Sequence, residues 1–429
     1  MPEDTIFALA SGSVRSAIAV MRISGSDAGP ALAGLGGGRL PRPRQASLRA
    51  LRDAEGALLD QALVLWLPGP GSYTGEDSAE LHLHGGRAVI EGVAAALVVA
   101  GLRPAEPGEF TRRAFLNGRL DLVQAEAVHD LIGAETDAQR RQALRQMAGE
   151  LGALYQDWAA RLQGVLAYQE ALIDFPDEDL PPEAEAQLLA TLRDVRAEME
   201  THLDDDHRGE KLREGLLFAI TGAPNVGKST LINALAGREV AIVSAIPGTT
   251  RDALETRVAL GGVPVTLVDT AGLRETDDPI EAEGVRRARA HAEEADLVIA
   301  LVEAGDAAPE LPGSVLLVAS KADLGHPGPG GAMRVSAVTG EGMDALRRRL
   351  AAIARDATET AGPPPLTQAR HRAALQDAVA HLAMAEAAAL PELRGEDLRL
   401  AMRALGRITG HVGVEDILDT VFSRFCIGK

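Results

Sequence analysis

One run of eight residues, Gly222–Ser229 (GAPNVGKS), constrains the fold of this chain more than any other feature. It follows the apolar run Leu216–Ile220 and precedes the helix-compatible segment Thr230–Ala236. A strand, a glycine loop and a helix in this order are typical of a phosphate-binding loop, and a chance match is the less favoured alternative. Glycines let backbone N–H groups turn towards phosphate oxygens, Lys228 can reach the β- and γ-phosphates, and the Ser229 hydroxyl can bind Mg²⁺. The sequence therefore predicts a nucleotide site on a P-loop fold.

Two further motifs of the same class follow the loop in the expected order. The strand Val263–Asp269 ends in an aspartate that can hold the Mg²⁺ shell through water, and the backbone amide of Gly272 can sense the γ-phosphate. Before this strand lies Gly248–Asp252, where we expect Thr250 to be the second protein ligand of Mg²⁺. An ordinary loop threonine is the alternative. The place of Thr250 between the phosphate loop and Asp269 favours the ligand role, because switch segments lie there.

The segment after the strand Val315–Ala319 indicates which base is bound. The Asp323 carboxylate can accept from guanine N1–H and the exocyclic amine, a donor pair that adenine lacks, and the Lys321 stem can lie along the base. Ser320 stands where such motifs commonly carry Asn. The pair Ser336-Ala337 can supply a backbone amide to guanine O6. These residues favour GTP over ATP.

The residue that follows Gly272 departs from the Ras-like pattern. It is Leu273, where Ras-like enzymes carry the glutamine that orients the attacking water. Because leucine cannot orient water, either hydrolysis is slow or another group acts. Arg251 and Arg274 are close enough in sequence to serve as arginine fingers, and solvated switch charges are an equal alternative.

Residues 1–117 are predicted to form a mixed α/β domain. Ala17–Ile23 and Ala62–Leu67 have strand character, and Gly29–Arg44 is predicted to be a surface loop because it is rich in Gly, Pro and Arg. The alternation in 78–84 predicts a strand with two different faces.

On that strand, Glu80, His82 and His84 are predicted to share one face, with Leu81 and Leu83 on the other. The two histidines could bind a metal ion, but no third ligand is evident nearby. A polar wall that faces a ligand is favoured over a metal site.

From Leu120 onward the pattern is helical. Steps of three and four predict one long apolar stripe in the core of a helical bundle. Its members are Leu144, Met147, Leu151, Leu154, Trp158, Leu162 and Val165. Helical pattern also follows residue 366, so a compact α/β module at 213–365 is predicted to be inserted into one helical domain made of 118–212 and 366–429.

The composition limits the class of protein. A formal net charge of −19 argues against non-specific coating of nucleic acid, so a nucleic acid would have to meet a local basic patch or arrive through another subunit. The single cysteine, Cys426, cannot form an internal disulfide, which fits a reducing cytoplasm. The N-terminal residues lack the pattern of a signal peptide, and no apolar stretch is long enough to span a bilayer. A cytoplasmic protein is predicted.

Motifs outside the nucleotide module extend over all three predicted domains. They are Arg22–Gly25, Ser72–Asp77, Glu80–Gly86, Pro107–Thr111, Phe115–Leu122, Gln124–Val128, Gly248–Asp252 and the terminal Phe425–Lys429. With these motifs the whole sequence resembles the family of tRNA modification GTPases MnmE (TrmE).

The resemblance implies a fold and an activity. It implies an N-terminal α/β domain similar to folate-binding enzymes, which mediates homodimerisation, and a central helical domain that carries an inserted Ras-like P-loop GTPase domain. It implies a GTPase that works with an FAD- and NADH-using partner, MnmG (GidA), in a heterotetramer or larger complex. That complex adds an aminomethyl or carboxymethylaminomethyl group at C5 of the wobble uridine of certain tRNAs, with a one-carbon unit from 5-formyl- or methylene-tetrahydrofolate.

The resemblance also assigns residues, position by position. The folate site is implied to involve Arg22, Glu80, Arg119 and Lys429, with Arg119 standing where some members have Lys. A K⁺ ion in the place of an arginine finger is implied to be held by Asn225, Ser244, Ile246 and Thr249. The water-positioning carboxylate maps to Glu281, with an exposed helix carboxylate as the alternative. Cys426 maps to a cysteine proposed to take part in modification, and a buried, inert thiol is the alternative because reactivity needs a lowered pKa.

The predicted nucleotide site combines these motifs. Its members are Asn225, Val226, Gly227, Lys228, Ser229, Thr230, Ser244, Ala245, Ile246, Pro247, Gly248, Thr249, Thr250, Asp269, Thr270, Ala271, Gly272, Ser320, Lys321, Asp323, Ser336 and Ala337. Lys228 and Glu281 are the predicted catalytic groups for hydrolysis, and Cys426 is the one for modification. The competing interpretation is a non-catalytic, GTP-dependent switch in ribosome or complex assembly, which would have no use for the folate motifs or the terminal Cys-Ile-Gly-Lys.

Overall fold

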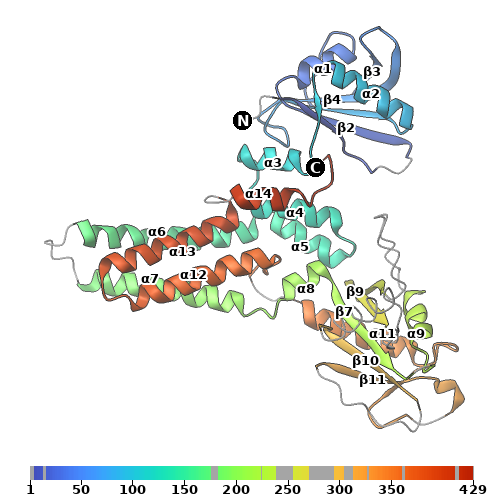
Figure 1. The fold of residues 1–429 in the computed structure, drawn as a ribbon, viewed down its shortest axis with the longest axis vertical. Helices are drawn as coiled ribbons and strands as arrows, with labels where there is room; N and C mark the ends of the chain where they lie inside the picture. Colours follow the sequence, from blue (N-terminus) through green and yellow to red (C-terminus); the bar gives the residue numbers. More distant parts are fainter. Residues whose placement is uncertain are drawn as a thin grey trace, which may run out of the picture. The chain divides into compact units, whose positions relative to one another are not determined.

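The computed structural model of the chain describes residues 4–12, 16–174, 182–223, 225–237, 255–269, 294–303, 313–325, 328–359, 363–410 and 415–428. The chain divides into two compact units. The first consists of Met1–His129, Met147–Ala159 and Met402–Lys429, and the second of Asp130–Gln146 and Ala160–Ala401. Figure 1 shows the fold and labels many of its helices and strands.

The first unit contains a six-stranded sheet, as far as the chain is described, with the order β3-β4-β5-β2-β1-β6. Its strands are β1 (Ile6–Leu9), β2 (Ile18–Ser24), β3 (Ser47–Arg52), β4 (Leu58–Leu67), β5 (Ser78–His84) and β6 (Arg103–Pro104). Two helices, α1 (Ala28–Leu35) and α2 (Arg87–Val99), pack on the sheet (Figure 1). The apolar core between them includes Leu32, Val64, Leu81 and Leu97, and it forms because alternate strand residues point to the same face.

Helix α1 corrects the prediction of a surface loop at Gly29–Arg44. The helix buries Ala28, Ala31 and Leu32, and Gly29 packs against the ring of Trp66. Gly29 lets the helix approach the sheet closely, because a Cβ atom at this position would lie 3.0 Å from the Trp66 ring. Only the part that follows Leu35 runs without regular structure as far as the next strand.

The strand predictions are confirmed. Strand β2 covers Ile18–Ser24 and β4 includes the predicted Ala62–Leu67. Along β5, Leu81 and Leu83 are buried, whereas Glu80 and His82 are only partly covered, so the two predicted faces exist.

The N-terminal and C-terminal parts of the chain meet within the first unit. Helix α3 (Glu109–Leu116), the start of α4 (Leu122–Gly133) and α14 (Glu415–Phe422) share an apolar cluster. The cluster contains Phe115, Leu122, Ala125, Leu418, Val421, Phe422 and Phe425. The last residues of the chain are therefore held against the segment that follows the N-terminal sheet.

The helical part of the second unit is built from α5 (Asp137–Met147) as far as Gln146, from the later turns of α6 (Glu150–Asp174), from α7 (Pro182–Leu203) and α12 (Ala369–Ala387), and from α13 (Pro391–Thr409) as far as Ala401. Figure 1 shows α7 and α12 side by side. Leu162, Leu192, Val195, Leu375, Leu382 and Leu398 are among its buried side chains. None of the described helices is both long and apolar enough to cross a membrane.

The predicted apolar stripe from Leu144 to Val165 is divided between two helices. Helix α5 (Asp137–Met147) ends before Gly149, and α6 starts at Glu150. Gly149 has a φ of +85°, which lies outside the helical region and breaks the stripe. Leu151, Trp158 and Leu162 are buried, but Leu144 and Met147 are 40% and 41% exposed.

The nucleotide module of the second unit has a sheet with the order β12-β11-β10-β7-β9-β8 among its described strands. These are β7 (Leu216–Gly222), β8 (Glu255–Leu260), β9 (Val263–Asp269), β10 (Leu297–Val302), β11 (Val315–Ala319) and β12 (Met333–Arg334). Only the pairing of β8 with β9 is antiparallel. Helices α9 (Lys228–Ala236) and α11 (Met343–Thr358) cover it. The parallel strands place the loops that follow them at one edge.

Helix α8 (Arg208–Glu214) links this module to the helical part through polar contacts. The Arg213 guanidinium donates to Asp130 at 2.7 Å, and Gln139 donates to the Arg213 carbonyl at 2.9 Å. At the start of α8, the backbone of Gly209 lies so close to that of Leu366 that a side chain at position 209 would collide with it. The segments that enter and leave the module therefore run next to each other.

Candidate functional site

The phosphate loop lies between β7 and α9, as predicted. Lys228 is 6% exposed, and its Nζ donates to the carbonyl oxygens of Gly222 and Ala223, each at 2.8 Å. The ammonium group is thus held inside the loop at the start of α9, where it can meet phosphate oxygens together with the helix N-terminus. Asn225, in the same loop, has a φ of +62°.

A hydroxyl and a carboxylate meet beside this loop. The Ser229 hydroxyl donates to Oδ2 of Asp269 at 3.0 Å. The two residues come together because β7 and β9 are parallel neighbours, with Ile220 paired to Asp269 at their carboxyl ends. Oxygen ligands of these two types are those that Mg²⁺ prefers, so the pair fits the predicted magnesium site.

The base-recognition segment follows β11 at the same edge of the sheet. The Ser320 amide donates to the Val302 carbonyl at 3.0 Å, and Asp323 is exposed in the short turn Ala322–Leu324. Lys321 forms an ion pair with Glu303, the residue after β10. The sequence prediction missed Glu303, although a carboxylate directly after a buried strand beside β11 was a usable signal.

The two residues predicted to contact guanine O6 differ in their surroundings. The Ser336 amide donates to the Glu341 carbonyl at 2.8 Å, and the Ser336 hydroxyl accepts from the Thr339 amide at 3.1 Å. The Ser336 amide is therefore engaged inside its own turn. Ala337 is half-buried in that turn and becomes the better candidate for the base contact.

Several predicted site residues lie outside the described part of the chain. They are Ser244, Ala245, Ile246, Pro247, Gly248, Thr249, Thr250, Thr270, Ala271, Gly272, Glu281 and Lys429. The arginine-finger candidates Arg251 and Arg274 lie outside it as well. Val226, Gly227 and Thr230 lie within the described loop and the first turn of α9, as predicted.

A second group of predicted residues lies on the N-terminal sheet. Arg22 of β2 and Glu80 of β5 face each other across the strands, and the guanidinium donates to Glu80 Oε1 from Nε at 3.1 Å and from Nη2 at 2.9 Å. The guanidinium carbon lies 5.5 Å from the ring centre of Tyr73 and 5.8 Å from that of Phe110. The sequence prediction missed both rings as parts of this site, although each lies in one of the quoted motifs.

The side chains that hold these rings in place are mostly polar, and several of them are buried. Burial raises the pKa of Tyr73, whose hydroxyl is 2.9 Å from that of Thr111. Arg113, 3% exposed, pairs with Glu76 at 3.2 Å and with Glu109 at 2.9 Å. Burial would raise the pKa of Glu109, but hydrogen bonds from arginines and a backbone amide lower it below its usual value. These ion pairs fix the loop that carries Tyr73 against α3.

The predicted histidine face carries no metal cluster. His84 Nδ1 lies 2.7 Å from the Asp60 carboxylate, whereas His82 Nε2 lies 3.6 Å from Glu80. The two histidines thus contact different carboxylates. Within the described ranges, no three His, Cys, Asp or Glu side chains are close enough to hold a metal ion.

The C-terminal segment lies in the same unit as the Arg22 pair. Ile427 forms an antiparallel bridge with Pro107, and the Gly108 amide lies 3.5 Å from the Cys426 carbonyl. Cys426 is exposed, so the alternative of a buried thiol is wrong. Arg119, also exposed, packs its methylene groups beside Gly75.

Comparison with known proteins identifies the family. Residues 5–119 match the family model described as GTP-binding protein TrmE N-terminus, and residues 122–426 match the MnmE helical domain. The chain is similar to the tRNA modification GTPase MnmE of Gluconacetobacter diazotrophicus, with 64% identity over 99% of this chain and 98% of the relative. This chain belongs to the MnmE family.

Another MnmE, from Granulibacter bethesdensis, is 58% identical over the full length of both chains. The solved G domain of FeoB from Methanococcus jannaschii covers 33% of this chain and 98% of its own length, at 25% identity and a TM-score of 0.24. Membership of the MnmE family rests on the sequence relatives. It confirms the predicted fold class, with an N-terminal α/β domain, a helical domain and an inserted P-loop domain.

Proposed function

We propose that this chain is the GTP-hydrolysing subunit of a complex that modifies C5 of the wobble uridine of certain tRNAs. The group added is aminomethyl or carboxymethylaminomethyl, and its one-carbon unit comes from a tetrahydrofolate derivative. The observation that carries the proposal is the 64% identity, over nearly the whole chain, to a protein named tRNA modification GTPase.

The nucleotide module supplies the groups for GTP binding. Lys228 binds the β- and γ-phosphates, and Ser229 and Asp269 hold Mg²⁺, directly and through water respectively. Mg²⁺, when bound, neutralises charge on the phosphate oxygens. Asp323 reads guanine, Lys321 lies along the base, and the Ala337 amide binds O6. Glu303 supports this role because its ion pair orients Lys321.

Hydrolysis needs a substitute for the glutamine that Leu273 replaces. We assign the water-positioning role to Glu281 and the place of an arginine finger to K⁺. Asn225 is the proposed K⁺ ligand that lies within the described chain, and its φ of +62° is a left-handed conformation that asparagine tolerates better than most residues. Ser244, Ile246 and Thr249 are the further K⁺ ligands that we assign.

The one-carbon chemistry is assigned to the first unit. Arg22 and Glu80 form a charged pair flanked by Tyr73 and Phe110, which suits a flat ligand with polar edges. Arg119 and Lys429 add positive charge for a folate derivative. Cys426 is exposed on the segment next to Pro107 and is the candidate group for the modification step.

The proposed assembly follows the family. Two copies pair through the N-terminal domain, residues 1–117, and an FAD-dependent MnmG subunit joins them in a heterotetramer or larger complex that acts on tRNA. The helical domain comprises 118–212 and 366–429, with the GTPase domain at 213–365 between them. A cytoplasmic location agrees with a single, exposed cysteine.

Mass spectrometry of tRNA nucleosides tests the function. A strain without this chain should lack the modified wobble uridine, and the wild-type gene should restore it. A Lys228→Ala gene should fail to restore it, because the phosphates lose their ammonium partner. Normal modification in the deletion strain would contradict the proposal and leave a GTP-dependent assembly switch as the function.

The potassium role has a separate test. GTP turnover of the wild-type protein should be faster in K⁺ than in Na⁺ at equal ionic strength. Asn225→Ala should remove most of that difference while Mg²⁺-dependent GTP binding persists. Equal turnover of the variant and the wild type in both salts would show that Asn225 is not a K⁺ ligand.

A further inference from the structure

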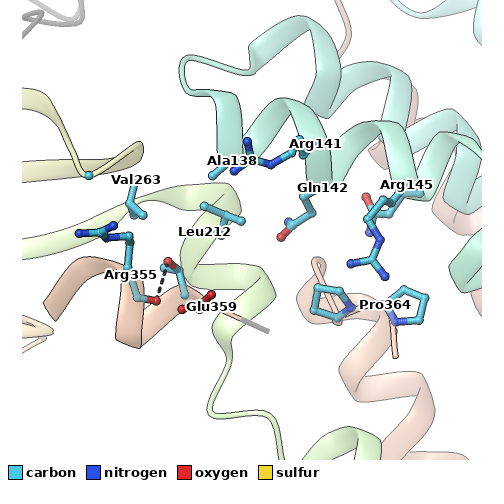
Figure 2. Close-up of a pocket in the computed structure, with 13 residues that line it drawn as sticks. Ala138, Arg141, Gln142, Arg145, Leu212, Val263, Arg355, Glu359 and Pro364 are labelled. Atoms are coloured by element: carbon cyan, nitrogen blue, oxygen red, sulfur yellow. Dashed lines mark hydrogen bonds between the residues drawn. The ribbon is translucent and has the colours of Figure 1, made fainter. Parts of the chain in front are cut away.

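A pocket of about 400 Å³ lies within the second unit, between α5 and the C-terminal end of α11 (Figure 2). Helix α5 contributes Arg141 and Arg145, and α11 contributes Arg355. The carboxylate in the lining is that of Glu359, one residue after α11. Figure 2 shows the three arginines at different corners of the pocket. The described lining thus carries three guanidinium groups and one carboxylate.

This local charge is opposite in sign to that of the whole chain, which has 43 basic and 62 acidic residues. Arg141 and Arg140 share a single carboxylate, that of Asp137. One carboxylate cannot neutralise two guanidinium groups, so α5 keeps an excess of positive charge. Because Arg141, Arg145 and Arg355 are all exposed, a polyanion can reach them.

The pocket is separate from the nucleotide site. Val263, the first residue of β9, lines the pocket, whereas Asp269, the last residue of the same strand, lies beside the phosphate loop. A strand of this length spans about 20 Å. The arginines therefore lie at the opposite edge of the sheet and cannot contact the phosphates of a nucleotide bound at Lys228.

The lining also contains an oriented hydrogen-bond acceptor. Gln142 lies between Arg141 and Arg145 on α5, and its Nε2 donates to the Gly209 carbonyl at 3.1 Å. With its NH₂ group engaged in this way, the side chain offers Oε1 as an acceptor in the pocket. A ligand that suits the pocket carries several negative charges and a hydroxyl donor. The ribose-phosphate backbone of RNA has both.

We propose that the pocket formed by Arg141, Arg145 and Arg355 binds the phosphate backbone of tRNA, with Gln142 accepting from a ribose hydroxyl. The inference rests on the proposed function, which makes tRNA a partner of the chain. It gives an acidic protein a local basic surface for RNA. Because α5 belongs to the helical part and α11 to the nucleotide module, a bound strand would bridge the two parts of the second unit.

The test compares tRNA binding by full-length wild-type protein and the triple variant Arg141→Gln/Arg145→Gln/Arg355→Gln. Fluorescence anisotropy with a labelled tRNA transcript is measured between about 50 and 200 mM salt, where phosphate contacts dominate the salt dependence. The triple variant should bind tRNA at least about ten-fold more weakly than the wild type. The slope of log K against log salt should be less steep by about 2 to 3. Arg145→Gln alone should lower the slope by about 1.

A matched control variant loses the same number of positive charges at a surface far from the pocket in the chain. Arg39→Gln/Arg52→Gln/Arg87→Gln alters three exposed arginines of the N-terminal domain and should bind tRNA as the wild type does. GTP turnover should be unchanged in both triple variants, which verifies that they are folded. The inference would be overturned if the pocket variant had the tRNA affinity and the salt dependence of the wild type. It would also be overturned if the wild-type protein bound tRNA without any salt dependence. The proposed function would stand in either case, since wobble-uridine analysis tests it separately.

Discussion

At the scale of single residues, His202 makes stability depend on pH. It is buried at the end of α7, and this burial lowers its pKa from 6.5 to about 4. Asp205 partly opposes the shift, and Arg372 and His371 add to it. Below pH 6.5 the unfolded chain binds a proton that the folded chain does not. The free energy of unfolding should therefore fall as the pH drops from 6.5 to 4, by about 3 kcal/mol in total.

Urea unfolding at a series of pH values measures this effect. The acidic side chains also titrate below pH 5, so the comparison is between the wild type and His202→Gln, which has no proton to bind. The free energy of unfolding of the wild type should fall more steeply between pH 6.5 and 4 than that of the variant. Parallel curves for the two proteins would show that His202 does not contribute.

Ser229 provides a second prediction at this scale. Ser229→Ala removes the hydroxyl that lies 3.0 Å from Asp269 and is proposed to bind Mg²⁺. GTP turnover at low Mg²⁺ should fall by about ten-fold or more, because the metal loses a protein ligand. Thr191→Ala is the control, since it removes an exposed helical hydroxyl of α7 that bonds to the Gln187 carbonyl. A Mg²⁺ titration of turnover equal to that of the wild type would rule out the assigned role.

At the scale of elements, two glycines of the helical region predict effects of opposite sign. Gly149, between α5 and α6, has a φ of +85°, so Gly149→Ala should lower the free energy of unfolding by about 1 kcal/mol. Gly164 lies inside α6 with open space around it, so Gly164→Ala should raise that free energy by about 0.5 to 1 kcal/mol. Chemical denaturation of both variants measures the difference. An unchanged or higher free energy of unfolding in Gly149→Ala would contradict the role of Gly149 as a helix stop.

The same two regions show what the sequence could and could not predict. The period of three and four residues predicts helix on both sides of Gly149, because it depends only on the apolar face. It cannot show where one helix ends, because a single backbone angle decides that. The loop prediction at Gly29–Arg44 failed for a related reason. Glycine and proline weaken a helix locally, but burial of Leu32 and Leu35 against the sheet outweighs that preference.

Some residues of the candidate sites could be predicted from the sequence, and others could not. Lys228, Ser229 and Asp269 could be predicted, because a fixed order of motifs along the chain places them at one sheet edge. The contacts of Arg22 with Tyr73 and Phe110 could not, because they depend on three segments whose relative positions exist only in the fold. The Lys321–Glu303 pair likewise needs the neighbouring position of β10 and β11.

At the scale of the whole molecule, the close approach of Gly209 and Leu366 supports the nucleotide module as an insertion. Replacement of 213–365 by a short Gly/Ser linker should leave the remaining chain folded, because a few residues can join the two ends. Circular dichroism should show a helical protein that melts cooperatively. As a control, a linker of the same length is inserted in the middle of α12. This insertion should abolish the cooperative transition, because it interrupts a helix of the bundle. Loss of cooperativity in the first variant would contradict the insertion.

The bridge between Pro107 and Ile427 has a consequence for synthesis of the protein. The ribosome makes the N-terminal sheet first, and folding of a domain can begin while later parts are still being made. The segment that covers Pro107, however, follows both the long helices and the nucleotide module in the chain, so it is made after them. The first unit is therefore completed only after residues 415–427 have been made, so a chain that stops before Ile427 cannot form the bridge to Pro107.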